Sequence, residues 1–175
     1  MTLRCAMTGR PMAAGDGIYD DGEWISWDYL NQHLHERELQ EEFPTADLQL
    51  IQVFEDLVQA AADYKALTGR YLQVWGELGE LYAELKYGIK RHKVHAPGSD
   101  GRLGNDFIEI KTISPEKTGE KVQVKRSGNF NKLCVVRITD DWEFTARMID
   151  RKKLPNGEGG KLAKVKWSAM ENSDG

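Results

Sequence analysis

Apolar residues recur at helical intervals in the first half of the chain and alternate with polar residues in the second. Between residues 47 and 67 they return every three or four positions, which predicts an amphipathic helix. The apolar stripe of this helix consists of Leu50, Phe54, Leu57, Val58 and Ala61. Thr45 is the expected N-cap after the break at Pro44, and Gly69 marks the end.

A second helix is predicted over residues 70–87, with Gly88 as its C-cap. Its large apolar side chains form one broad stripe: Tyr71, Val74, Leu78, Leu81, Tyr82 and Leu85. A line of small residues, Gly76, Gly79 and Ala83, runs along its other side. Glycine inside a helix costs up to about 1 kcal/mol relative to alanine. We therefore expect this line to approach another element, the sheet, closely. Three acids flank the line, namely Glu77, Glu80 and Glu84.

Alternation after residue 98 predicts strands. Ile108 and Ile110 share a face that can be buried, while Phe107, Glu109 and Lys111 share the opposite face. The nearly all-apolar stretch 133–139 predicts a central strand covered on both sides. Further predicted elements are strands at 121–126, 142–149 and 162–167, and a short helix or cap at 151–154. Helices followed by strands predict a mixed α/β domain over residues 45–170.

Residues 1–44 predict a small appendage built on a β-hairpin. Turn signals at 15–17 and 20–22 flank strand-forming residues. These residues are Ile18, Tyr19, Trp24, Ile25 and Trp27. The arrangement is similar to a degenerate zinc ribbon, because Thr8 stands where a second cysteine would pair with Cys5. His33 and His35 lack the paired spacing of zinc ligands, so we expect them on a solvated helix.

Composition places the chain among globular proteins, with 175 residues, 40% hydrophobic and 30% charged. No apolar run approaches a membrane span and no apolar signal segment opens the sequence, so a cytoplasmic protein is expected. Cys5 and Cys134, far apart in the sequence, predict two reduced thiols. The formal charge of −4 is not typical of a nucleic-acid binder. Basic residues gather locally, however, at 86–93 and 117–132, and such a face can hold a phosphate backbone.

Candidate chemistry concentrates between Gly98 and Pro115. Asp100 lies in a glycine-rich turn, and a strand then carries Glu109 and Lys111 on one face. Two neighbouring carboxylates favour a hard divalent cation such as Mg²⁺ or Mn²⁺. The lysine can orient or deprotonate a water, or neutralise charge on a phosphate.

This layout resembles the PD-(D/E)XK nuclease superfamily, of the restriction-endonuclease-like fold. Asp100 matches the first acid and Glu109-Ile110-Lys111 matches E-x-K, although Ser99 replaces the proline before the acid. The G-E-L-G-E sequence of the second helix is similar to a helix motif of bacterial members, in which Glu80 is the acid that joins the metal site. The resemblance covers about residues 70–150 and implies a mixed central sheet flanked by helices. It assigns Asp100, Glu109 and Glu80 to the metal and Lys111 to catalysis.

Several alternatives remain open. Glu77 could replace Glu80, and Asp106 could replace Asp100. Gln123 and Lys125 form a second Q-x-K pattern on another strand. The two histidines near the site, His92 and His95, are expected to be surface or structural residues. The helix acids could also be a solvated face.

The resemblance implies a metal-dependent nuclease, with DNA as the expected substrate and Lys125, Arg126 and Lys93 as nucleic-acid contacts. The alternative is an inactive nuclease-fold protein that acts as a nucleic-acid- or protein-binding module. The N-terminal hairpin could serve as a protein-interaction module, and a homodimer is a further possibility.

Overall fold

The computed structural model describes residues 2–93, 98–155 and 161–170. The chain divides into two compact units, Met1–Pro44 and Thr45–Gly175. The first unit contains the 3-10 helix η1 (Ala14–Asp16), the strands β1 (Gly17–Asp20) and β2 (Glu23–Ser26), and the helix α1 (Trp27–Glu42). The predicted turn between the strands is present, with Asp21 and Gly22 both at positive φ, as two-residue hairpin turns require.

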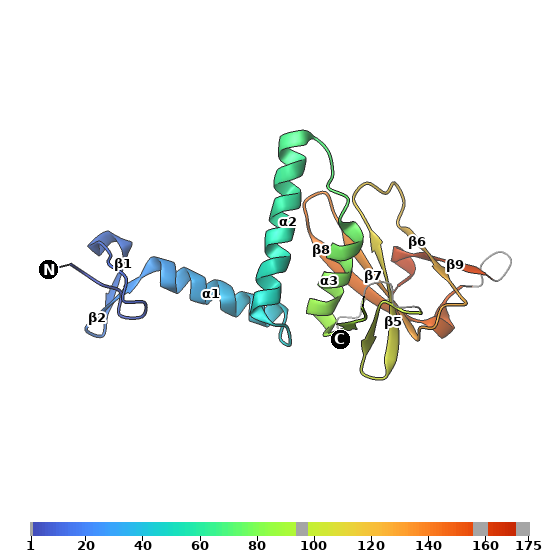
Figure 1. The fold of residues 1–175 in the computed structure, drawn as a ribbon, viewed down its shortest axis with the longest axis horizontal. Helices are drawn as coiled ribbons and strands as arrows, with labels where there is room; N and C mark the ends of the chain where they lie inside the picture. The colour runs from blue at the N-terminus through green and yellow to red at the C-terminus, as the bar shows by residue number, and fades with distance from the viewer. Residues whose placement is uncertain (1, 94–97, 156–160, 171–175) are drawn as a thin grey trace. The chain divides into compact units, whose positions relative to one another are not determined.

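The second unit contains two helices and seven strands within its described residues (Figure 1). The helices are α2 (Leu48–Thr68) and α3 (Trp75–Tyr87). The strands are β3 (Lys90–Arg91), β4 (Gly101–Leu103), β5 (Asp106–Ile113), β6 (Lys121–Lys125), β7 (Lys132–Ile138), β8 (Phe144–Asp150) and β9 (Leu162–Lys166). Two 3-10 turns follow strands: η2 (Arg151–Lys153) and η4 (Trp167–Ala169).

Five strands form a mixed central sheet in the order β3-β4-β5-β7-β8. Only β5 and β7 run parallel, with Ile110 opposite Cys134, and the remaining pairs are antiparallel. Strand β7 is buried on both faces, as its apolar sequence predicts, and Leu133, Val135 and Val136 are fully enclosed. The predicted mixed α/β class is confirmed.

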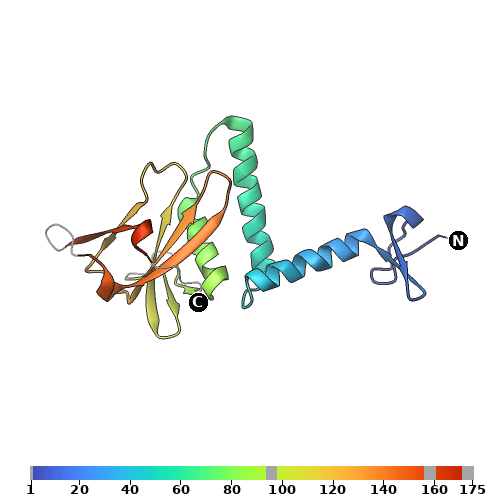
Figure 2. The same cartoon turned by 180° about the vertical axis from the view of Figure 1, so that it is seen from behind.

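The two faces of the central sheet are covered differently (Figures 1 and 2). Helix α3 packs on β5 and β7 with its buried residues Leu78, Leu81 and Leu85, and α2 packs on α3. The opposite face is covered by a separate antiparallel pair, β6 and β9. Their alternate apolar residues join one core with residues of the central sheet: Ile113, Val122, Val124, Leu133, Val135, Ala163 and Val165.

Several predicted boundaries are wrong. The second helix begins at Trp75 rather than at residue 70, because residues 70–74 form a turn with Val74 N–H bonded to Leu72 O. Asp47, not Thr45, caps α2 by accepting a hydrogen bond from Gln49 N–H.

Three other predictions also need correction. Trp142 adopts φ of 61° in the turn before β8 and stacks on Trp75, so the strand begins only at Phe144. Trp27 opens α1 instead of extending the hairpin, because Ser26 caps the helix through Tyr29 N–H. Gly76 does not approach another element, since a Cβ placed there would meet nothing within 4 Å.

Other predictions are confirmed. Gly88 ends α3 in the left-handed conformation, and Gly79 approaches the sheet closely, because a Cβ there would lie 2.0 Å from Thr112 Oγ1. Cys5 and Cys134 are both free thiols. His95 and the last five residues lie outside the described residues. None of the helices in the described part of the chain is long and apolar enough to cross a bilayer.

Candidate functional site

The candidate site lies where β4 leaves β5. The two strands pair only from Gly101 opposite Ile108 to Leu103 opposite Asp106. Asp100 continues the ladder beyond β4. Its N–H donates to Ile108 O at 3.0 Å, and its carboxylate Oδ2 accepts from Ile110 N–H at 2.6 Å. The backbone of Asp100 is therefore fixed to β5 through Ile108, and its carboxyl is fixed through the Ile110 N–H.

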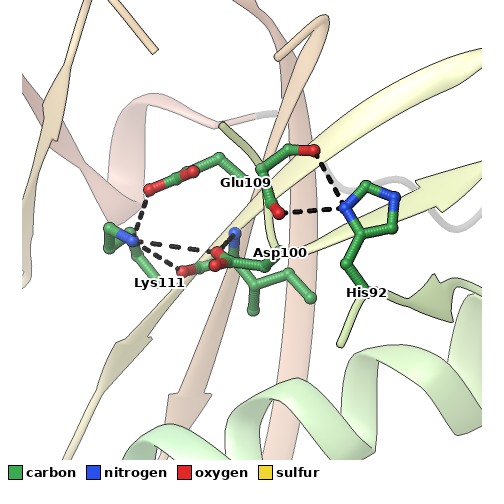
Figure 3. Close-up of polar contacts among 6 residues, drawn as sticks. His92, Asp100, Glu109 and Lys111 are labelled. Atoms are coloured by element: carbon green, nitrogen blue, oxygen red, sulfur yellow. Dashed lines mark hydrogen bonds and ion pairs between the residues drawn. The ribbon is translucent and has the colours of Figure 1, made fainter. Parts of the chain in front are cut away.

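Lys111 joins the two carboxylates of the predicted motif (Figure 3). Its Nζ lies 2.6 Å from Glu109 Oε1 and 3.9 Å from Asp100 Oδ2, and it donates to the backbone oxygen of Ile110 at 3.0 Å. The side chains of Lys111, Asp100 and Glu109 stay 35%, 29% and 19% exposed, respectively. Two carboxylate oxygens and one backbone oxygen of the hairpin thus converge on the Lys111 ammonium, which a ligand can still reach.

Glu80 reaches the same region from α3. Burial raises the pKa of its carboxyl above the ordinary value, and the nearby negative charges of Asp100 and Glu77 raise it further. Arg91 and Lys111 oppose this rise. Glu80 lines the same pocket as Ile110 and Lys111, where a bound cation would stabilise its charged form.

An open pocket of about 390 Å³ adjoins the cluster and is lined by Glu80, Ile110 and Lys111. Its far side is formed by the loop after β5. Glu116 on that loop accepts hydrogen bonds from Trp75 Nε1 at 2.6 Å and from Gln73 Nε2 at 2.9 Å. These hydrogen bonds connect the loop after β5 to the start of α3. The pocket is therefore bounded by these two segments.

The turn that carries Asp100 is supported by His92. The His92 N–H donates to Asp100 O at 2.9 Å, and its ring Nδ1 lies 3.0 Å from Ser99 O and 3.4 Å from Ser99 Oγ (Figure 3). Ser99 is buried. His92 therefore acts on the shape of the turn, in agreement with the structural role expected for it.

The competing acids have other partners. Glu77 and Glu84 both form ion pairs with Arg91 at 2.6 Å, so Glu77 already has a guanidinium partner outside the cluster. Asp106 pairs with Lys132 at 2.9 Å at the opposite end of β5. Gln123 lies on the exposed side of β6, in the separate two-stranded sheet. These contacts favour Glu80 and Asp100 over their alternatives.

The predicted nucleic-acid contacts do not lie together on one element. Lys93 is exposed after β3, whereas Lys125 ends β6 and Arg126 follows it. Lys125 belongs to a surface that we call the lysine face, the exposed side of β6 and β9. It consists of Lys121, Gln123, Lys125, Leu162, Lys164 and Lys166. Lys121 lies directly opposite Lys166, and none of the four lysines makes an ion pair with any residue that the structure describes.

The donors at the cluster fit a hard divalent cation. Within residues 2–93, 98–155 and 161–170, no three His, Cys, Asp or Glu side chains are grouped to hold a metal unaided. The cluster instead combines two carboxylates, Asp100 and Glu109, with the carbonyl of Ile110, and these oxygens already surround the Lys111 ammonium. Mg²⁺ is typically held by one or two carboxylates and completes its shell with water and substrate oxygens.

Sequence reasoning missed three parts of this site. The Ile110 backbone contributes both the N–H that holds Asp100 and an oxygen of the cluster. Its role depends on where β4 ends, which no residue pattern reveals. Glu116 and Gln73 close the pocket from segments that are far apart in the sequence. Only the polar residues after the turn at Pro115 could have pointed to them.

Together the fold and the site define a mixed α/β protein with an acid–lysine cluster at an open edge of its parallel strand pair. The sequence matches no protein-family model, and no curated protein is significantly similar to it.

Proposed function

We propose that this protein is a metal-dependent nuclease that hydrolyses phosphodiester bonds in DNA, in the manner of the PD-(D/E)XK superfamily that its motif resembles. The observation that carries the proposal is the convergence of Asp100, Glu109 and the Ile110 carbonyl on the Lys111 ammonium. The raised pKa of Glu80, which lines an accessible pocket together with Lys111, is of the kind that gathers at functional sites. The free thiols of Cys5 and Cys134 suit the cytoplasm.

Each residue has a role that follows from its contacts. Asp100, Glu109 and the Ile110 carbonyl would hold Mg²⁺ or Mn²⁺, with Glu80 assisting from α3. The metal, when bound, supplies positive charge that activates water and stabilises a pentavalent phosphate. Lys111 carries the ammonium, which donates hydrogen bonds to a water or to a non-bridging phosphate oxygen. Water attacks phosphorus and the ester P–O bond breaks; the hydroxyl of the water stays on phosphorus, and the proton that it loses passes through solvent to the leaving oxygen.

The lysine face supports DNA as the substrate. Four lysines and no acid occupy the exposed side of β6 and β9, on a chain with a formal charge of −4. Like charges placed directly opposite each other, such as Lys121 and Lys166, destabilise a strand pair. The negative charges of a phosphate backbone would relieve this repulsion, and the lysines would hold the backbone in turn.

Plasmid cleavage with Mg²⁺ or Mn²⁺ tests the proposal. The wild type should cleave, Lys111→Ala should lose at least about a hundredfold in rate, and Lys132→Ala should retain the rate because Lys132 pairs with Asp106 outside the cluster. Equal cleavage by the wild type and Lys111→Ala would remove the role assigned to Lys111.

A matched pair of acids separates a metal site from an ion-pair network. Asp100→Asn keeps an oxygen that can accept the Ile110 N–H, so the fold should persist while Mn²⁺ affinity falls by roughly tenfold or more in calorimetry. Asp106→Asn, in the same hairpin, should bind Mn²⁺ like the wild type. Equal affinities of both variants would contradict the metal assignment.

A binding module without turnover is the second candidate. The observation that favours it is the close Lys111–Glu109 pair, which already neutralises one carboxylate. Under this alternative, DNA or RNA binds without cleavage in Mg²⁺ and Mn²⁺, and Lys111→Ala changes binding alone.

A further inference from the structure

Helix α2 carries apolar residues both on the face that its own domain covers and on an exposed face beside it. Ile51, Phe54 and Ala61 are buried and form the covered stripe. A second stripe lies about 100° around the helix, at 100° per residue. We call it the α2 seam: Leu50, Val53, Leu57, Ala60, Tyr64 and Leu67.

Five of the six seam residues are exposed, and Leu50 is half-buried. Val53 is 50% exposed, Leu57 40%, Tyr64 38% and Leu67 86%. Single exposed apolar residues are normal, but a continuous row marks a surface that another molecule covers. The seam therefore needs an occupant.

The spacing specifies the kind of occupant. Successive seam residues are separated by three, four, three, four and three positions. This is the 3.5-residue repeat at which helices interlock side by side. The occupant is thus a helix with the same repeat. Helix α2 of another molecule is such a helix, and its 21 residues extend for about 30 Å.

We propose that the α2 seam pairs with the α2 seam of a second copy of the chain, in antiparallel orientation about a two-fold axis. Antiparallel pairing places Leu57 against Ala60 of the second copy, Val53 against Tyr64 and Leu50 against Leu67, so the largest side chain, that of Tyr64, meets a smaller one. Parallel pairing would put Tyr64 against Tyr64 and leave a gap between two alanines. Interior packing tolerates neither overcrowding nor voids.

The charges beside the seam give the pairing a distinctive salt response. Asp56 and Asp63 border it on the polar side, where Gln52 and Gln59 donate hydrogen bonds to them. Antiparallel pairing brings the acidic borders of the two copies together. Added salt screens their repulsion, so self-association should strengthen with salt. A foreign helix with basic borders would bind more weakly as salt rises.

Sedimentation of the full chain tests the pairing. A single pair of helices forms a small interface, so self-association should be weak and should increase with protein concentration. Leu57→Glu should raise the dissociation constant by roughly tenfold or more. Gln123→Glu, an equal change of charge on the exposed side of β6, should leave it within about threefold. A monomer at all concentrations, or a dimer indifferent to Leu57→Glu, overturns the proposal.

Disulfide trapping tests the orientation. Leu57→Cys protein mixed with Ala60→Cys protein should oxidise mainly to the mixed dimer. The native Cys5 and Cys134 are buried, and the wild type serves as background. Predominant dimers of Leu57→Cys with itself, or association that weakens with salt, would overturn antiparallel self-pairing. Both results are independent of nuclease activity.

Discussion

Glu80 is the residue whose ionisation is most affected by the candidate site. Its carboxyl is partly removed from water, and Asp100 and Glu77 add negative charge nearby, so its pKa is raised from 4.5. The folded protein therefore binds this proton more tightly than the unfolded chain does. The resulting stability is present below pH 4.5 and is lost as the pH rises through the raised pKa. At neutral pH the charged form opposes folding.

Glu80→Gln should consequently stabilise the metal-free protein at pH 7, with a melting temperature higher by on the order of 2 °C. It should give no gain at pH 4, where the wild-type carboxyl is protonated. Calorimetry in EDTA across this range measures the difference. Glu77→Gln is the matched control and should not stabilise, because it removes the partner of Arg91. Equal gains at both pH values would show that the effect does not arise from titration.

The residue types of the site could be predicted from the sequence, and their contacts only in part. Asp100, Glu109 and Lys111 meet as the hairpin spacing indicates, because alternate residues of a strand share a face. The choice of Asp100 over Asp106 rests on the ion pair of Asp106 with Lys132. Lys132 belongs to β7, which pairs with β5 although a long connection separates the two strands in the sequence. A local sequence pattern cannot predict that pairing.

At the scale of the element, α3 is held to β5 by a close contact. A Cβ on Gly79 would lie 2.0 Å from Thr112 Oγ1 and 3.1 Å from Thr112 Cβ. Thr112 is a short branched side chain that cannot swing aside, so the helix would have to move away from the strand. Glu80 directly follows Gly79 in the sequence. The contact between Gly79 and Thr112 therefore also sets the position of the Glu80 carboxyl.

Gly79→Ala should therefore lower the free energy of unfolding by about 1–3 kcal/mol through overpacking. Gly76→Ala is the matched control in the same helix. It meets nothing within 4 Å and should stabilise by up to about 1 kcal/mol through helix propensity. Urea unfolding measures both changes. Adding Thr112→Ala to Gly79→Ala should recover part of the loss, and a purely additive double variant would contradict the contact.

Element types and the two helix ends marked by Gly69 and Gly88 could be predicted, but the starts of α3 and β8 could not. The stripes of α2 and α3 and the apolar run of β7 are strong local signals. The start of α3 depends instead on Gln73 and Trp75, which bind Glu116 from another segment. The start of β8 depends on Trp142, which turns back onto Trp75. Tertiary contacts decided both boundaries.

At the scale of the whole molecule, the distribution of charge matters more than its sum. The chain carries a formal charge of −4, yet the lysine face is uniformly positive. The sequence indicated a basic stretch that included Lys125, but it did not reveal that Lys164 and Lys166 share its surface. That grouping requires the pairing of β6 with β9, which also removes both strands from the central sheet.

This grouping predicts how salt should affect DNA binding in EDTA, where cleavage does not interfere. Each lysine that contacts a phosphate releases a condensed counterion, so the logarithm of the binding constant falls with the logarithm of salt concentration by about 0.9 per contact. Lys164→Gln with Lys166→Gln should reduce that slope by roughly 2. Lys65→Gln with Lys132→Gln is the charge-matched control, because these lysines are already paired with Asp140 and Asp106, respectively.

If the slope does not change in the double variant, the lysine face does not contact DNA. That result does not bear on the hydrolytic site. A reduced slope with intact cleavage of short substrates would instead show that the face holds DNA away from the reacting phosphate. The second outcome is expected, because the lysine face points away from the central sheet while the apolar side of β6 and β9 packs against it. Binding affinity and chemistry should therefore respond to different substitutions.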